Sequence, residues 1–181
     1  MNKPQREFLD RATAEAVRAN HPFAQMAASE AALESNWGNS ELALDANNLF
    51  GMKQHAHPVC GTINLPTKEF LDGKWIPCTS QWVNYPDWRA CFADRLATLE
   101  RLSNAYPHYK AAIEAKDAET FVRQVSLTWS TDPAWVCSCG KEFIDQKIAF
   151  AHVAPGHVTR VVPGLARALK ALSIYREYTA V

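Results

Sequence analysis

One interruption of helical periodicity divides this chain of 181 residues. Apolar side chains recur at helical spacing in residues 4–19. Between residues 49 and 85 this period disappears, and β-prone segments instead surround an Asp72-Gly73 turn signal. Helical patterns then resume. The sequence therefore predicts a mainly helical α+β domain with a small β-hairpin lobe over about residues 49–85.

The helical patterns also have recognisable ends. Gly38 is expected to end the second predicted helix, while Ser40 and Asp117 are expected to be the N-caps of the third and fifth. No repeat or linker is visible, so residues 1–181 are expected to form a single domain. The predicted helices, in chain order, are 4–19, 22–37, 40–45, 89–103, 117–129, 133–151 and 162–174.

Composition excludes several classes of protein. The 19 basic and 19 acidic residues give zero net charge, so there is no basic surplus to bind nucleic acid. No run of 18 or more apolar residues occurs, which argues against membrane insertion. The charged, amphipathic N-terminus lacks the apolar segment of a secretory signal. We expect a globular protein, and a monomer.

The five cysteines form an odd set, so at least one has no partner within the chain. Cys60 and Cys78 flank a predicted β segment, and a disulfide across it is one possibility. A zinc site is another, but its donors match no strong zinc spacing. We expect buried or idle thiols, and neither a metal nor a cofactor. The donors of that zinc alternative would be Cys137, Cys139, His152 and His157.

Two glutamates lie on the apolar stripe of the helix predicted at residues 22–37. On a helix of about 100° per residue, the residues within roughly 60° of Phe23 are Met26, Ala27, Glu30, Glu34 and Trp37. A carboxyl group held among apolar side chains tends to keep its proton, as a general acid for glycoside cleavage requires. Paired structural glutamates, or a rotated helix with solvated ones, fit the same pattern. The pattern does not choose between Glu30 and Glu34.

Several segments resemble motifs of glycoside hydrolase family 73, the bacterial wall glucosaminidases that include autolysins, phage lysins and the muralytic domain of the flagellar rod cap. The segments ALESNWGNSELA at 32–43 and NNLFGMK at 47–53 are similar to its A-x-E-S/T-x-W-G-x-S and N-L-F-G-I-K blocks. Further similar segments are TKEF at 67–70, WVNY at 82–85 and WSTDPAW at 129–135. The resemblance covers about residues 5–150 and implies a lysozyme-like fold with a β-lobe beside the cleft.

The same resemblance implies roles for individual residues. Glu34 matches the catalytic acid, and Glu30 is then expected to be structural. Glu69 matches the position proposed for the water-activating carboxylate, unless the substrate's own N-acetyl group serves as internal nucleophile. Asp132 is expected to be an N-cap. Trp129 stands where the family has tyrosine, which keeps the aromatic ring but loses the hydroxyl group.

Sugar-binding side chains are expected to come from the same motifs. Among them Trp129 is the strongest candidate for the cleft. A core role is favoured for Trp37 and Phe50, and a loop-stabilising role for Asn48. The candidate substrate-binding residues are Trp129, Trp135, Asn48, Phe50 and Trp82.

Peptidoglycan glycan strands are the implied substrate, and the implied activity is that of an endo-β-N-acetylglucosaminidase. An N-acetylmuramidase or a lytic transglycosylase would use the same core. A non-catalytic wall-binding module and a cytosolic metal-binding protein are alternatives of other classes. Action on the cell wall, in the periplasm or outside the cell, would need phage lysis or a dedicated secretion system, unless the chain is truncated.

Overall fold

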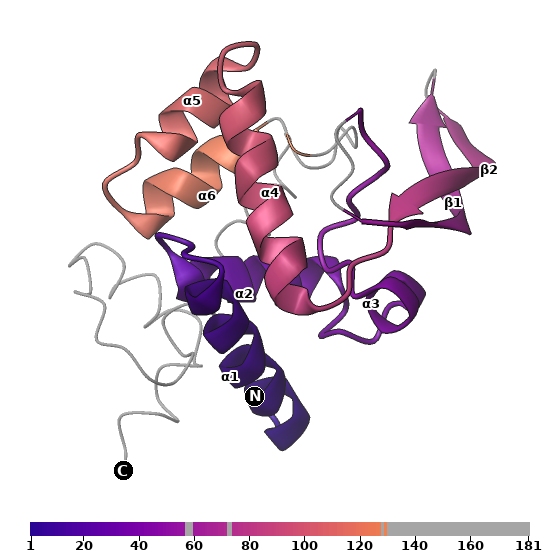
Figure 1. Ribbon diagram of the computed structural model, residues 1–181, viewed down its shortest axis with the longest axis horizontal. Helices are drawn as coiled ribbons and strands as arrows, with labels where there is room; N and C mark the ends of the chain where they lie inside the picture. The colour runs from indigo at the N-terminus through magenta and orange to yellow at the C-terminus, as the bar shows by residue number, and fades with distance from the viewer. Residues whose placement is uncertain (57–59, 72–73, 128, 130–181) are drawn as a thin grey trace.

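A computed structural model of the chain describes residues 1–56, 60–71, 74–127 and 129, without the side chains of residues 69–71 and 75. Six helices form a body within these residues, and one antiparallel pair of strands extends from it (Figure 1). The predicted combination of a mainly helical domain with a small β-hairpin lobe is confirmed.

Helix α1 (Lys3–Arg18) begins where the sequence predicts. The Asn2 side chain accepts a hydrogen bond from the Gln5 backbone N–H at 3.0 Å, and the Gln5 side-chain oxygen accepts one from the Asn2 backbone N–H at 3.0 Å. Such a reciprocal cap satisfies two backbone N–H groups of the first turn. One face of α1 is buried against α2 and α4. That face consists of Phe8, Leu9, Ala12, Thr13 and Ala16.

Helix α2 (Ala24–Glu34) differs from its prediction in two ways. Every residue from Met26 to Ala32 is buried. This includes Ser29 and Ala32, which were predicted to lie on the side of the helix opposite the apolar stripe. The helix is therefore central to the body rather than amphipathic. It also ends at Glu34 instead of Trp37.

A left-handed turn ends α2 early. Asn36, Trp37 and Gly38 have φ values of 50°, 57° and 75°. The Ser35 hydroxyl accepts a hydrogen bond from the Gly38 backbone at 2.8 Å, which fixes the turn. A Cβ atom on Gly38 would lie 2.9 Å from a ring carbon of Phe8, so glycine is required there. Trp37 packs edge-on against Phe8, which agrees with the core role favoured for it.

Helix α3 (Glu41–Ala46) follows this turn. The Ser40 side chain accepts a hydrogen bond from the Ala43 backbone at 3.2 Å, so the predicted N-cap is confirmed. Asn47 ends the helix in the left-handed conformation.

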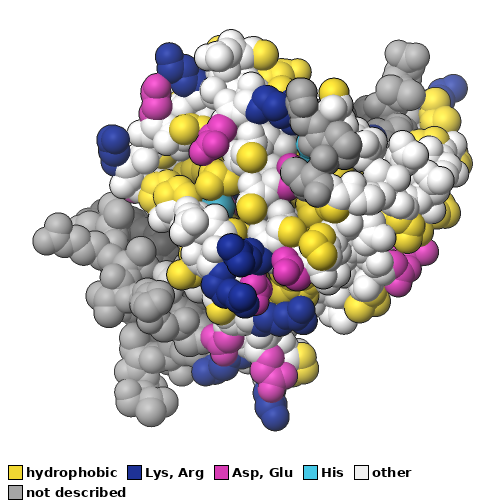
Figure 2. Space-filling model, viewed as in Figure 1, with side chains coloured by type: hydrophobic (Ala, Val, Ile, Leu, Met, Phe, Trp, Pro, Cys, Tyr) yellow, Lys and Arg dark blue, Asp and Glu magenta, His cyan; other side chains and the backbone are white. Residues whose placement is uncertain are grey.

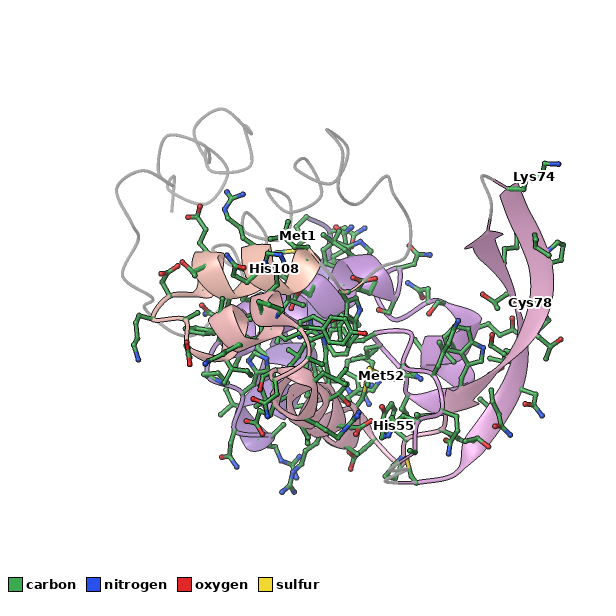
Figure 3. All side chains as sticks on the ribbon, turned by 90° about the horizontal axis from the view of Figure 1, so that it is seen from above. Met1, Met52, His55, Lys74, Cys78 and His108 are labelled. Carbon is green, nitrogen blue, oxygen red and sulfur yellow. The ribbon has the colours of Figure 1, made fainter. Side chains whose placement is uncertain are left out.

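The β-hairpin consists of β1 (Thr62–Leu71) and β2 (Lys74–Val83), paired from Thr62 with Val83 to Leu71 with Lys74. Figure 3 shows it curving away from the helices, with Lys74 at its free end and Met52 near its base. Backbone hydrogen bonds join the hairpin to the body: the N–H groups of Gln54, Val83 and Tyr85 donate to the carbonyls of Gln81 (2.9 Å), Met52 (3.0 Å) and Ala46 (2.8 Å).

The possible disulfide between Cys60 and Cys78 is wrong, because both thiols are free. Cys78 lies opposite Thr67 in the hairpin register. Cys60 precedes β1, seven positions from Thr67, and at about 3.4 Å per strand residue the two cysteines are too far apart to bond.

Helices α4 (Trp88–Leu102), α5 (Pro107–Ile113) and α6 (Ala118–Ser126) complete the described body. Asp117 caps α6 as predicted, although that helix ends before Trp129. Helix α5, which begins with a proline at its first position, was not predicted. The helices predicted at 133–151 and 162–174 lie outside the described residues.

The visible face in Figure 2 carries basic and acidic side chains mixed together around α1. This agrees with the zero net charge. Within the residues described, no helix has the length and apolar character that a membrane span requires.

Candidate active site

A groove of about 290 Å³ lies between the helical body and the hairpin. The body side is formed by the end of α2, the start of α3 and the segment 48–51; the hairpin side comes from both strands. The lining residues are Glu34, Ser40, Glu41, Leu42, Asn48, Phe50, Gly51, Leu65, Pro66, Thr67 and Trp82. Four of the residues predicted for the site, Glu34, Asn48, Phe50 and Trp82, therefore face one groove.

Glu34 is the last residue of α2 and is partly buried. Because the preceding turns of α2 are fully buried, the helix reaches the groove only at this end. The left-handed turn that follows leads the chain away from the helix axis. As a result, the Glu34 side chain lies in the groove between the core and the hairpin.

Glu30, one turn earlier on α2, is fully buried and forms an ion pair with Arg95 of α4. The Arg95 Nη2 atom lies 3.0 Å from each carboxylate oxygen of Glu30. The guanidinium group also stacks on two rings, 4.5 Å from the centre of Phe50 and 4.8 Å from that of Trp129. Glu30 therefore has the structural role favoured for it. It holds Arg95, and Arg95 in turn contacts the ring of Phe50, which lines the groove.

Arg95 was missed by the sequence analysis. It lies on the buried face of α4 together with Cys91, Phe92 and Leu99. A basic residue among apolar positions at helical spacing was the available signal, because a buried charge requires a partner. The signal does not identify that partner.

Asn48 is buried, and its side-chain amide binds the protein's own backbone. It donates to the Met52 carbonyl at 2.8 Å and to the Val83 carbonyl at 2.9 Å, and accepts from the Met52 N–H at 2.9 Å. The favoured loop role is confirmed: Asn48 joins the 48–52 segment to the base of β2. Phe50 is only 3% exposed and packs edge-on against Phe92, so it is a core residue whose edge reaches the groove.

Trp82 forms part of the hairpin side of the groove and is half-buried. Its indole N–H donates to the Leu65 carbonyl across the hairpin at 3.4 Å. The Lys53 ammonium group lies 5.5 Å from the ring centre. The ring is thus held from two directions at the groove wall.

Trp129 is not among the described residues that line the groove, and two further predicted residues, Glu69 and Trp135, lie wholly or in part outside the described structure. Glu69 is in β1, opposite Ile76 and two positions beyond the groove residue Thr67, but its side chain lies outside the described part. Trp129 is partly buried against the core and covered on one side by Arg95. Trp135 lies outside the described residues, as does Asp132.

A second polar cluster connects the hairpin base to α4. The Tyr85 hydroxyl donates to Asp94 Oδ2 at 2.6 Å, and His55 Nε2 lies 3.3 Å from the same oxygen. Burial, followed by the nearby Cys91 thiol and the bond to Asp94, raises the pKa of Tyr85 well above its usual range. The tyrosine therefore stays protonated and donates. The sequence analysis did not find this cluster.

The thiols show no sign of metal binding in the part of the chain that the structure describes. Cys60, Cys78 and Cys91 are free, and no group of three or more potential metal ligands occurs among the described residues. Burial raises the pKa of Cys91 to about 12. The possible zinc donors at positions 137, 139, 152 and 157 lie outside these residues.

Comparison with known proteins gives a consistent picture. A family model described as "Glucosaminidase: Mannosyl-glycoprotein endo-beta-N-acetylglucosaminidase" matches residues 10–144. A probable N-acetylmuramidase from Lactococcus lactis subsp. cremoris is 29% identical over 127 residues, which are 68% of this chain and 29% of that protein. The exo-glucosaminidase LytG from Bacillus subtilis is 33% identical over 119 residues, 62% of this chain and 40% of that protein. The chain thus spans less than half the length of these relatives.

Among solved structures, the catalytic domain of the autolysin Auto from Listeria monocytogenes matches with a TM-score of 0.66 at 22% identity. The match covers 85% of this chain and 88% of that one. It shows the same fold, and the predicted lysozyme-like architecture is confirmed.

Proposed function

The chain belongs to the glucosaminidase family of glycoside hydrolases, as the sequence motifs predicted, and on that premise we propose that it hydrolyses the glycan strands of bacterial peptidoglycan. The proposed bond is the β-1,4 linkage that follows N-acetylglucosamine. The relatives that are named an N-acetylmuramidase, an exo-glucosaminidase and an autolysin support peptidoglycan as the substrate.

Glu34 is the proposed general acid, and its place in the groove is the observation that carries the proposal. It would protonate the glycosidic oxygen while the bond from that oxygen to the anomeric carbon breaks. The carbonyl end of a helix disfavours negative charge, and Glu34 is the last residue of α2. Partial burial acts in the same direction. Both suit a carboxyl group that must deliver a proton.

Water must then attack the anomeric carbon, and Glu69 is the proposed group to activate it. In inverting glycosidases the second carboxylate lies about 6.5–9.5 Å from the acid. Glu69 is in β1, where every second residue belongs to the same face of the strand. Leu65 and Thr67, which precede it at this spacing, line the Glu34 groove. Attack by the substrate's own N-acetyl group is the second candidate mechanism, and it would need no second carboxylate.

The groove walls have separate tasks in this proposal. Trp82 would provide an aromatic surface for a sugar ring from the hairpin side, and the edge of Phe50 would do so from the body. Asn48 would act indirectly by holding the 48–52 segment in place. Trp129 and Trp135 stay proposed sugar-binding residues on the strength of the motif alone.

The proposed place of action is the cell wall, in the periplasm or outside the cell, and the proposed state is a monomer. Phage lysis or a dedicated secretion system would give the protein access to the wall. Family membership supports extracellular or periplasmic action.

Purified cell walls and the variant Glu34→Gln test the proposal. The wild-type protein should reduce the turbidity of a wall suspension, and the variant should do so at least 100-fold more slowly, since general acid catalysis contributes about 10²–10⁴-fold. Glu114→Gln, an exposed carboxyl group of an i,i+4 pair at the end of α5, is the control. Equal lysis by wild type and Glu34→Gln would reject Glu34 as the acid. Binding of the wild-type protein to walls without lysis would favour a wall-binding module.

Mass spectrometry of the released fragments identifies the bond that is cut. N-acetylglucosamine at the reducing ends supports the proposal. N-acetylmuramic acid there indicates a muramidase, and 1,6-anhydro ends indicate a lytic transglycosylase.

A further inference from the structure

Glu41 is a second carboxyl group on the wall of the Glu34 groove, and the function proposed above gives it no role. It is the first residue of α3 and is exposed to solvent. Ser40, which caps that helix, also lines the groove, so the start of α3 forms part of the groove wall. Among the described residues, no salt bridge involves Glu41. Its charge therefore faces the groove without a compensating cation from the described part of the chain.

The described part of the groove lining is acidic. The lining residues that the structure describes contain two carboxyl groups, Glu34 and Glu41, and no Lys, Arg or His. Lys53, which lies 5.5 Å from the Trp82 ring centre, is not one of them. An anion that entered this groove would lose hydration and meet like charge.

The two sugars of peptidoglycan differ in charge at one position. N-acetylglucosamine has a hydroxyl group at O3, whereas N-acetylmuramic acid has a lactyl ether there, whose carboxyl group is free on strands stripped of peptide and amide-linked on strands that carry it. A carboxylate such as Glu41 can accept a charge-assisted hydrogen bond from a sugar hydroxyl. It repels a lactyl carboxylate at the same place.

We propose that Glu41 is a specificity-determining residue, which admits the uncharged N-acetyl sugar to the groove beside Glu34 and disfavours a sugar that bears a carboxylate. This inference rests on the proposed function, because it concerns the substrate of the same groove. Its consequence, on glycan strands stripped of peptide, is the register of cleavage. With N-acetylglucosamine seated at Glu41, the bond that Glu34 reaches is the one that follows this sugar.

The test uses one glycan in two forms, prepared from peptidoglycan whose peptides have been removed by an amidase. In one form the lactyl carboxylates are free; in the other they are coupled to methylamine and carry no charge. The values of kcat/KM on both forms are compared for wild type, Glu41→Gln and Glu41→Lys. Asp45→Asn and Asp45→Lys are matched controls, since Asp45 is an exposed acidic residue of the same helix that does not line the groove.

The wild-type protein should prefer the neutralised glycan, and Glu41→Gln should reduce that preference about fivefold, the factor expected for two unit charges about 4 Å apart in water. Glu41→Lys should reduce it further and should produce new reducing ends of N-acetylmuramic acid. The wild-type preference should shrink in 1 M salt, where the Debye length falls to about 3 Å. The Asp45 variants should behave as wild type.

An unchanged preference in Glu41→Lys would overturn the proposal. An equal loss of activity on both glycans would overturn it too, because a purely structural or catalytic role has no charge selectivity. Release of N-acetylmuramic acid ends by the wild type would also overturn it. None of these results affects Glu34 as the acid, which the turbidity assay with Glu34→Gln decides separately.

Discussion

The buried ion pair between Glu30 and Arg95 allows a quantitative test of what holds the groove floor together. The two side chains are 1% and 2% exposed, and Nη2 lies 3.0 Å from each carboxylate oxygen. The guanidinium group is also stacked between the rings of Phe50 and Trp129. Removing either partner alone would leave the other charge buried without compensation.

The expected free energies of unfolding follow from that geometry. Replacing one partner of a buried pair destabilises a protein by about 3–5 kcal/mol. Arg95→Met should also lose two cation–π contacts, worth about 0.5–1 kcal/mol each. The double variant Glu30→Met/Arg95→Met buries no charge, so it should lose only about 1–2 kcal/mol. The two single losses should therefore exceed the double loss by at least about 5 kcal/mol, a large part of a typical stability of about 5–15 kcal/mol.

Urea denaturation of wild type, both single variants and the double variant measures this coupling, with tryptophan fluorescence as the signal. The partly exposed pair of Glu119 and Arg123 has the same 3.0 Å separation at 33% and 39% side-chain exposure, and is the control. Its double-mutant cycle should give no more than about 0.5 kcal/mol. Additive losses at Glu30 and Arg95 would refute the reasoning, since they would mean that neither charge depends on the other.

Two further substitutions test the pH dependence of the fold and the turn after α2. Burial, and secondly the charge of Arg95, lowers the pKa of His21 from its ordinary value of 6.5 to about 3. Between about pH 3 and pH 6.5 the unfolded chain therefore binds a proton at His21 that the folded protein does not. As a result, the free energy of unfolding is highest above pH 6.5 and falls by about 1.4 kcal/mol per pH unit as the pH decreases from 6.5 toward 3. His21→Gln should flatten the curve of unfolding free energy against pH in that range, whereas the exposed His108→Gln should not; equal slopes would contradict the assignment. Gly38→Ala should lower stability by about 2–4 kcal/mol, because it places a Cβ at a φ of 75° and 2.9 Å from Phe8. Thermal unfolding checks this against Gly61→Ala, whose Cβ would meet nothing within 4 Å, and similar losses for both would be inconsistent with a steric role for Gly38.

The parts of the fold that the sequence predicted are those with local signals. Helix α1 begins at a cap formed by residues three positions apart, and the two strands pair up to Leu71 and Lys74, on either side of the Asp-Gly signal. The end of α2 could not be predicted in the same way. Gly38 gives the correct region, but the turn begins earlier at Ser35, and it is enforced by contact with Phe8 on a different helix.

The site shows the same division. Glu34 was found because its motif is continuous in sequence. Arg95 is 65 residues from Glu30, so the pair exists only once α2 and α4 are packed together. Glu41 was part of a quoted motif without a role of its own, because its place on a groove wall depends on the hairpin opposite.

The contrast between the two sides of the groove has an evolutionary consequence. On one side, the proposed acid Glu34 is the last residue of a helix embedded in the core, so a substitution that displaces α2 is expected to reduce stability and activity together. On the other side, Val83 is the only buried side chain among those described in the two strands. Substitutions of the other described strand side chains should therefore change the free energy of unfolding only slightly. New glycan preferences are therefore expected to arise first in the strands and at exposed positions of the groove wall such as Glu41, while the proposed proton donor is retained.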